Sequence, residues 1–260
     1  MMIIGMCLIG GGAKGAFQGG ALKRFHEANI EPQIVTGTSI GAFNGYFVMK
    51  GSYNELEKFY IDPNEDDFNI KLGMVIDNSS LIDYMKKLEG VNQNVKEFFV
   101  NYVNINNQEL NEKVVNVKKA SYEKAIDAVK YSSLLPARLK SDRDVEELIR
   151  DYDTKKLFDN FKEDVKNGIY DGYNLDGGIL NNNFLEPFKK YNVDKLIIIG
   201  LKDGYMPPDY IYNFYNKKDI IILRPDIKIK PRDTIRFEKD FLNLMFERGY
   251  VLASKCLSSL

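Results

Sequence analysis

The sequence GTSIG, residues 37–41, places a serine at the centre of a GxSxG pattern. In this pattern the serine occupies a sharp turn between a strand and a helix, and the flanking glycines let the two elements pass close together. Ser39 would stand at a helix N-terminus, where partial positive charge favours a developing oxyanion. The pattern, with Gly37 and Gly41 on either side, therefore predicts a serine nucleophile for acyl transfer.

A serine nucleophile needs a base, and the chain has one histidine, His26. His26 lies eleven residues past Gly15, the last glycine of the GGGAKG loop, which is roughly 16 Å along a helix at ~1.5 Å per residue. We therefore expect His26 to be partly exposed and without a chemical role, and a carboxylate to accept the proton. Two Asp-Gly pairs offer one: Asp171 would lie at a hairpin tip facing water, whereas Asp176 would follow the returning strand into the sheet. Asp176 is the predicted base, and Asp171 is the alternative.

The stretch LIGGGAKGAFQGG, residues 8–20, has three interpretations. A phosphate-binding P-loop is excluded, because Lys14 is followed by glycine and alanine instead of serine or threonine. A dinucleotide fingerprint matches at Gly10, Gly12 and Gly15, but no acid stands at the end of the second expected strand to bind a ribose, since Glu31 precedes it. The third interpretation is an oxyanion hole made by the backbone N–H groups of residues 10–12, with Gly11 and Gly12 as the main donors.

Three motifs in this order, GGGAKG (10–15), GTSIG (37–41) and DGG (176–178), resemble those of the patatin-like phospholipase family, in its bacterial branch. The resemblance implies a lipid acyl hydrolase with a Ser39–Asp176 dyad, an oxyanion loop at Gly10, Gly11 and Gly12, and no metal or cofactor. Lys14 matches a basic residue of the glycine motif and has no assigned role. The remaining motif residues are Gly15, Gly37, Gly41, Gly177 and Gly178.

The expected reaction is cleavage of a fatty acyl ester through an acyl-enzyme intermediate. Because an ordinary aspartate has a pKa of about 3.9 and is a weak base, burial should raise the pKa of Asp176. A transacylase with the same dyad, a dinucleotide-binding protein and a binding protein without turnover are the alternatives. A lipid or another acyl ester is the expected partner.

Apolar strands that alternate with helices predict an α/β fold, a three-layer sandwich with a mostly parallel central sheet flanked by helices. A single domain is expected over residues 1–260, with a less regular, largely helical segment at about 52–167. Within that segment the asparagine-rich residues 101–111 are expected to form a loop. After that segment, residues 168–180 are expected to form a hairpin. Gln18 and Asn44 are expected on solvated helix surfaces. The expected strands are 2–9, 33–36, 195–201 and 219–223, and the expected helices are 16–29, 42–50, 81–88, 122–131, 142–150, 155–166 and 241–257.

Composition limits the partners and the location. The net charge of −1 gives no field to attract nucleic acid. Cys7 and Cys256 lie far apart without CxxC spacing, so neither a disulfide framework nor a zinc site is expected, and a cytoplasmic location fits. No apolar run is long enough to span a membrane, which leaves peripheral contact as the expected mode of lipid binding. The basic residues at 228–236 alternate with acids and predict a solvated loop.

Overall fold

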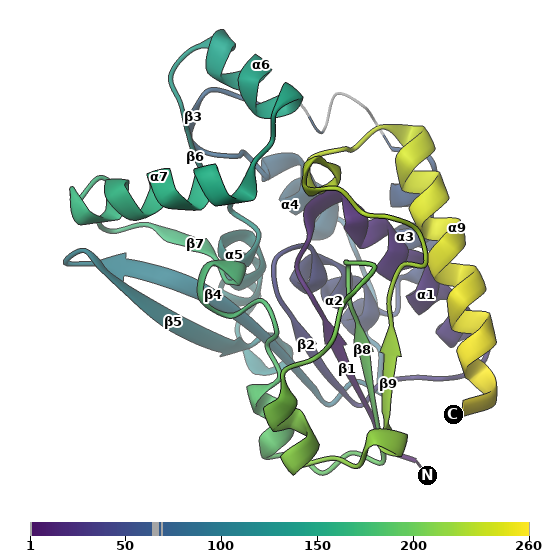
Figure 1. Cartoon of the computed structure of the whole chain (residues 1–260). Helices are drawn as coiled ribbons and strands as arrows, with labels where there is room; N and C mark the ends of the chain where they lie inside the picture. Colours follow the sequence, from purple (N-terminus) through teal and green to yellow (C-terminus); the bar gives the residue numbers. More distant parts are fainter. Residues whose placement is uncertain (1, 64–67, 69, 260) are drawn as a thin grey trace.

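A computed structural model describes residues 2–63, 68 and 70–259 of the chain. Its centre is a sheet in the order β5-β4-β2-β1-β8-β9, with β7 also paired to β4 (Figure 1). The strands are β1 (Ile4–Leu8), β2 (Ile34–Gly37), β4 (Glu97–Asn106), β5 (Glu109–Asn116), β7 (Asn174–Asp176), β8 (Lys195–Ile199) and β9 (Ile220–Leu223). Strands β4, β2, β1, β8 and β9 are parallel, whereas β5 and β7 run antiparallel to β4. Two short strands, β3 (Gly73–Val75) and β6 (Pro136–Leu139), form a separate antiparallel pair.

Helices connect the parallel strands. The α-helices are α1 (Gly15–Glu27), α2 (Ile40–Lys50), α3 (Tyr53–Ile61), α4 (Ser79–Lys86), α5 (Tyr122–Ser132), α6 (Asp142–Arg150), α7 (Thr154–Lys166), α8 (Gly178–Asn181) and α9 (Lys239–Cys256). The short 3₁₀ helices are η1 (Gly12–Lys14), η3 (Val117–Lys119), η4 (Glu186–Lys189), η5 (Asp209–Asn213), η6 (Lys217–Asp219), η7 (Pro231–Thr234) and η8 (Leu257–Ser259).

Strand β1 is buried on both faces, as its continuous apolar sequence predicts. Ile4, Met6 and Leu8 pack into a large core with α1, α2 and α9, whereas Cys7 and Ile9 face a second core that contains η4 and η5. The predicted α/β fold, with a mostly parallel sheet between two covering layers, is confirmed. One of those layers is made largely of 3₁₀ helices and loops instead of long helices.

The asparagine-rich segment is a strand pair, so the predicted loop at residues 101–111 is wrong. In β4 the apolar residues Val100, Val103 and Ile105 are fully buried between polar neighbours, and this packing outweighs the turn preference of asparagine. The turn itself is at Asn107 and Gln108, whose φ values of 53° and 62° suit a two-residue hairpin.

The predicted hairpin at residues 168–180 is also wrong. Residues 168–172 form turns, and β7 pairs with the distant strand β4 instead of with a neighbour in sequence. The segment 52–167 contains strands β3, β4, β5 and β6 besides the helices expected there. The single-domain organisation stays a prediction.

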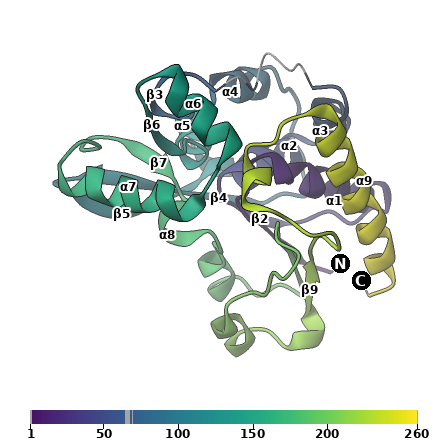
Figure 2. The ribbon, with the colours of Figure 1, turned by 45° about the horizontal axis from the view of Figure 1, so that its top comes forward.

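Helices α6 and α7 contact β6. Figure 2 shows α6 beside β3 and β6, and α7 beside β7 and β5, on the other side of the molecule from α1 and α9. On its inner side α7 packs Phe161 and Val165 against Val103 of β4 and Leu175 of β7. Helix α7 therefore covers one face of the sheet where β7 pairs with β4, the strand pair that ends at Asp176.

Candidate active site

Two strands meet end to end along one edge of β4. Strand β2 runs parallel to β4 and ends with Gly37 opposite Val100, whereas β7 runs antiparallel and ends with Asp176 opposite Tyr102. The carboxyl ends of β2 and β7 therefore converge beside Asn101, the residue between these two positions. Ser39 follows β2 by two residues, so this pairing brings together the predicted nucleophile and the predicted base.

Ser39 adopts a strained backbone conformation at the start of α2. Its φ of 57° and ψ of −126° lie in a region that favours glycine, and a strained turn of this kind exposes a nucleophilic side chain. The turn is possible because Gly41 packs directly on β1: a Cβ there would lie 2.1 Å from the Leu8 carbonyl oxygen. A Cβ on Gly37 would similarly lie 2.6 Å from the Gly41 carbonyl oxygen. The predicted close approach of strand and helix is present.

Asp176 is a buried carboxyl group beside Ser39. Loss of solvation raises its pKa from 3.8 to about 6, although hydrogen bonding by the Ser39 side chain and by the Gly178 N–H favours the ionised form. The Gly178 N–H donates to Asp176 Oδ1 at 2.7 Å. Asp176 is therefore a stronger base than an ordinary aspartate and is ionised above about pH 6. The alternative acid, Asp171, is exposed and accepts a hydrogen bond from the Gln108 N–H at 2.8 Å.

The glycine loop passes directly over Ser39, since a Cβ on Gly10 would lie 2.9 Å from the Ser39 Cβ. The Gly10 N–H is already used, because it donates to Asn182 Oδ1 at 2.9 Å. Within the described residues the N–H groups of Gly11 and Gly12 have no hydrogen-bond acceptor, which leaves them free to bind an oxyanion. Gly12 has a φ of +60°, and a Cβ there would lie 2.0 Å from the Thr234 carbonyl oxygen. Lys14 also faces the cavity, and Gly15 packs on Ile40 of α2.

The end of α5 joins the two halves of the site. Ser132 Oγ accepts a hydrogen bond from the Ser39 N–H at 2.8 Å, and the Ser132 carbonyl oxygen accepts one from the Gly177 N–H at 3.3 Å. Two residues later the Leu134 carbonyl oxygen accepts a hydrogen bond from the Asp176 N–H at 3.0 Å. One short segment therefore fixes the position of Ser39 relative to Asp176.

Replacing Ser132 with alanine should lower kcat about 10- to 100-fold with little change in KM. The substitution removes the acceptor of the Ser39 N–H, so the strained turn at Ser39 loses a hydrogen bond while the cavity walls remain. Steady-state kinetics on a short-chain ester would measure this effect. Ser121→Ala is the matched control, because Ser121 caps the other end of α5 and that variant perturbs the helix without touching the elbow. Equal losses in both variants would show that Ser132 acts only through the stability of α5.

Several buried polar side chains position the site and were not predicted. Gln18 Nε2 donates to the Ile9 carbonyl oxygen at 2.8 Å, and Asn44 Nδ2 donates to Gln18 Oε1 at 3.0 Å. Both side chains are fully buried, so their predicted position on solvated helix surfaces is wrong. Asn101 accepts a hydrogen bond from the Thr38 hydroxyl at 2.7 Å and donates to the Asn181 carbonyl oxygen at 2.8 Å. The buried positions of Gln18 and Asn44 had one possible signal in the sequence, which is that each polar residue stands where the helix pattern calls for an apolar one.

A cavity of about 610 Å³ opens beside Ser39 and Asp176. This volume is within the ~300–1,000 Å³ range of small-molecule sites. Much of its wall is apolar, and the residues that form this part are Phe68, Ile70, Ile76, Leu81, Leu135, Phe158, Ile229, Ile235 and Phe237. The cavity therefore brings together the predicted nucleophile, the predicted base, the N–H groups of Gly11 and Gly12, and an apolar wall.

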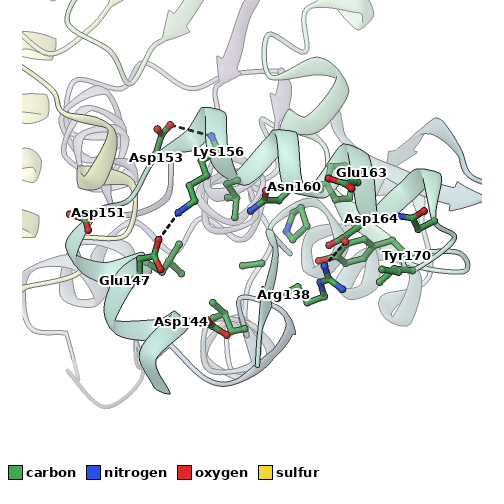
Figure 3. Close-up of a pocket in the computed structure, with 18 residues that line it drawn as sticks. Arg138, Asp144, Glu147, Asp151, Asp153, Lys156, Asn160, Glu163, Asp164 and Tyr170 are labelled. Atoms are coloured by element: carbon green, nitrogen blue, oxygen red, sulfur yellow. Dashed lines mark hydrogen bonds and ion pairs between the residues drawn. The ribbon is translucent and has the colours of Figure 1, made fainter. Parts of the chain in front are cut away.

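A second cavity, of about 460 Å³, lies between β6, α6 and α7 (Figure 3). Both basic residues in its lining are paired: Arg138 pairs with Asp164 at 2.7 Å, and Lys156 pairs with Glu147. Its lining is acidic on balance, because four more acids also line it: Asp144, Asp151, Asp153 and Glu163. Asp153 caps α7 through the N–H groups of Lys155 and Lys156. None of the described residues that line it is a serine, threonine, cysteine or histidine, so it offers no hydroxyl or thiol nucleophile of the serine, threonine or cysteine type.

The histidine lies outside the site. His26 is exposed, forms a hydrogen bond with Glu31 and stacks on Tyr53 with ring centroids 4.0 Å apart. It is not among the residues that line the cavity beside Ser39.

Among the described helices, none is long and apolar enough to cross a bilayer.

Comparison with known proteins identifies a matching family and proteins that resemble this chain in part. A family model described as patatin-like phospholipase matches residues 6–189. Lysophospholipase nte1 of Aspergillus terreus is 55% identical over 61 residues, which are 22% of this chain and 4% of that protein. The chain thus spans only a small fraction of the length of this relative. Among solved structures, VipD from Legionella pneumophila aligns with a TM-score of 0.46 at 11% identity, over 98% of this chain and 67% of that one.

Proposed function

The chain belongs to the patatin-like phospholipase family, and from that premise we propose that it is a serine lipid acyl hydrolase with a Ser39–Asp176 dyad. The observation that carries the proposal is the convergence of Ser39 and a buried Asp176 of raised pKa in a cavity with apolar walls. A dinucleotide-binding function has no comparable support, because β2 ends at Gly37 and is followed by Thr38 instead of an acid.

In the first half of the reaction, Ser39 Oγ attacks the ester carbonyl carbon while Asp176 accepts the hydroxyl proton. The negative charge that develops on the carbonyl oxygen is bound by the N–H groups of Gly11 and Gly12 and favoured by the N-terminus of α2. The tetrahedral intermediate then collapses, the carbon–oxygen bond to the alcohol breaks, and the alcohol leaves with the proton from Asp176. The fatty acyl group remains on Ser39 as an ester.

In the second half, Asp176 accepts a proton from a water molecule, whose oxygen attacks the acyl-enzyme carbonyl carbon. The bond to Ser39 Oγ breaks, Ser39 regains its proton from Asp176, and a fatty acid is released. An alcohol in place of water would give transacylation through the same acyl-enzyme. The apolar wall holds the acyl chain in both halves.

A fluorophosphonate probe tests this proposal directly, since it reacts with activated serines. We expect one equivalent of label per chain, located by peptide mass spectrometry on the peptide that contains Ser39, and no label after denaturation. The rate of fatty acid release from a mixed lipid extract should decrease in proportion to the fraction of chains that are labelled. A native chain that stays unlabelled, or that carries the label on another serine, would overturn the proposal. Binding of nicotinamide or flavin nucleotides by such an unlabelled chain would favour the dinucleotide alternative.

A further inference from the structure

Asn182 holds the first glycine of the oxyanion loop through both of its backbone polar groups. The Gly10 N–H donates to Asn182 Oδ1 at 2.9 Å, and Asn182 Nδ2 donates to the Gly10 carbonyl oxygen at 3.2 Å. A primary amide carries both a donor and an acceptor, so one side chain can satisfy both groups. Gly10 follows the end of β1 by two residues, and Asn182 bonds to it as a residue of a neighbouring strand would.

The hydrogen bond to the carbonyl oxygen acts on a predicted oxyanion donor. The Gly10 carbonyl group and the Gly11 N–H belong to one planar peptide unit, so a contact that holds the carbonyl oxygen also fixes the direction of the N–H. Glycine has more backbone freedom than any other residue, and three glycines stand in a row here. A partner outside the loop that restrains the Gly10–Gly11 peptide therefore restrains the Gly11 donor.

Asn182 also packs against the segment that carries the predicted base. A Cβ on Gly178 would lie 3.2 Å from Asn182 Oδ1 and 2.9 Å from Asp176 Oδ1. A Cβ on Gly10 would lie only 2.5 Å from Asn182 Oδ1. Because neither glycine has a side chain, Asn182 can contact the oxyanion loop and the Asp176 segment at once. Gly10, Gly178 and Asn182 all line the cavity beside Ser39.

The backbone that precedes Asn182 is anchored to the sheet. Helix α8 is a single turn that ends at Asn181, whose N–H donates to the Gly177 carbonyl oxygen at 2.9 Å. Asn101 Nδ2, from β4, donates to the Asn181 carbonyl oxygen at 2.8 Å. Asn182 can therefore restrain the glycine loop, because its own position is fixed relative to β4.

We propose that Asn182 is a positioning residue for the oxyanion hole: it holds the Gly10–Gly11 peptide so that the Gly11 N–H is oriented for the tetrahedral intermediate before the substrate binds. This inference rests on the proposed function. Donors that are already oriented stabilise a transition state without any cost of reorientation during the reaction. Without Asn182 the glycine loop would hold its donor in the productive orientation in only a fraction of molecules. Asn182 therefore acts on kcat and not on substrate binding.

Asn182→Leu and Asn182→Ala test this role. Leucine has a similar size and removes both hydrogen bonds, whereas alanine removes them and leaves a space. We expect kcat for a short-chain ester to fall about 10- to 100-fold in each variant with little change in KM, because a misplaced donor loses part of the roughly 10²- to 10³-fold that a missing donor costs. Asn183→Ala is the matched control and should keep its kcat. Asn183 accepts a hydrogen bond from the Tyr205 hydroxyl at 3.0 Å and does not line the cavity.

An alkyl trifluoromethyl ketone separates orientation of the donor from binding of the acyl chain. Ser39 Oγ adds to the carbonyl carbon, the Ser39 proton passes to Asp176, and the carbonyl oxygen becomes an oxyanion in the hole. In each Asn182 variant the inhibition constant of the ketone should rise by the same factor as kcat/KM falls, since both report stabilisation of the tetrahedral state. The corresponding trifluoromethyl alcohol cannot form this adduct, so its inhibition constant should not change.

Two results would overturn the inference. One is a kcat in the Asn182 variants that equals that of the wild type, or a loss that Asn183→Ala reproduces. The other is an equal rise in the inhibition constants of the ketone and the alcohol, because Asn182 would then shape the cavity and not the oxyanion loop. Thermal unfolding verifies that each variant is folded, and Asn182→Ala remains informative where leucine does not fit. If the proposed function itself fails, the wild type hydrolyses no ester and Ser39 is not labelled.

Discussion

Replacing Ser39 with alanine is expected to lower kcat/KM for ester hydrolysis by at least about 10⁴-fold, because no acyl-enzyme can then form. The oxyanion donors and the apolar wall remain, so the residual rate should be that of direct water attack and KM should change little. A fluorogenic short-chain ester would measure the loss, and the fluorophosphonate probe should give no label. Activity within tenfold of the wild type would disprove the nucleophilic role of Ser39.

The same position offers an internal control for folding. Ser39→Gly should be equally inactive but more stable than Ser39→Ala, since glycine adopts a φ of 57° without strain. Thermal unfolding of the two variants would compare their stability. If Ser39→Ala were the more stable of the two, the turn at Ser39 would not be strained as its backbone conformation implies.

The local motifs could be predicted from the sequence, because each needs only neighbouring residues. The strand at 2–9, its glycine turn and the following helix form one continuous pattern. In GTSIG the close approach of strand and helix requires residues without a Cβ at Gly37 and Gly41. The structure places Ser39 and the glycine loop where these patterns predict them to lie. The choice of Asp176 over Asp171 rested on the hairpin expected at residues 168–180, which is wrong. Asp176 is buried and Asp171 is exposed for another reason, the pairing of β7 with β4.

The pairings that assemble the site could not be predicted in this way. Strand β7 contacts β4 at Tyr102, more than seventy residues earlier in the sequence, and neither strand has a strong pattern of its own. Asparagine favours turns locally, yet Asn101 is held in a central strand by the valines around it and by its hydrogen bond with Thr38. The energies that decide such positions come from tertiary packing, and no short window of sequence contains them.

Burial raises the pKa of Asp176 and also lowers the stability of the fold when this carboxyl group is ionised. Its carboxyl group has a pKa of about 6 in the folded protein and an ordinary value near 3.8 in the unfolded chain. Between these two values the folded state holds more protons, so its stability falls as the pH rises through this window. Above about pH 6, where the carboxylate can act as a base, the full destabilisation is present. The ionised form that the proposed mechanism requires of Asp176 is therefore the form that weakens the fold.

Replacing Asp176 with asparagine should consequently have opposite effects on activity and stability. We expect kcat to fall by about 10²- to 10⁴-fold, because an amide cannot accept the Ser39 proton. At pH 8 the variant should unfold a few degrees above the wild type, and at pH 4 this gain should vanish because the wild-type carboxyl is then protonated as well. Scanning calorimetry at the two pH values would measure the difference, with the exposed Asp171→Asn as the control that changes neither property. If the stability of the variant relative to the wild type did not increase from pH 4 to pH 8, the pKa of Asp176 would not be raised in the folded protein, and its carboxylate would be too weak a base for the proposed mechanism.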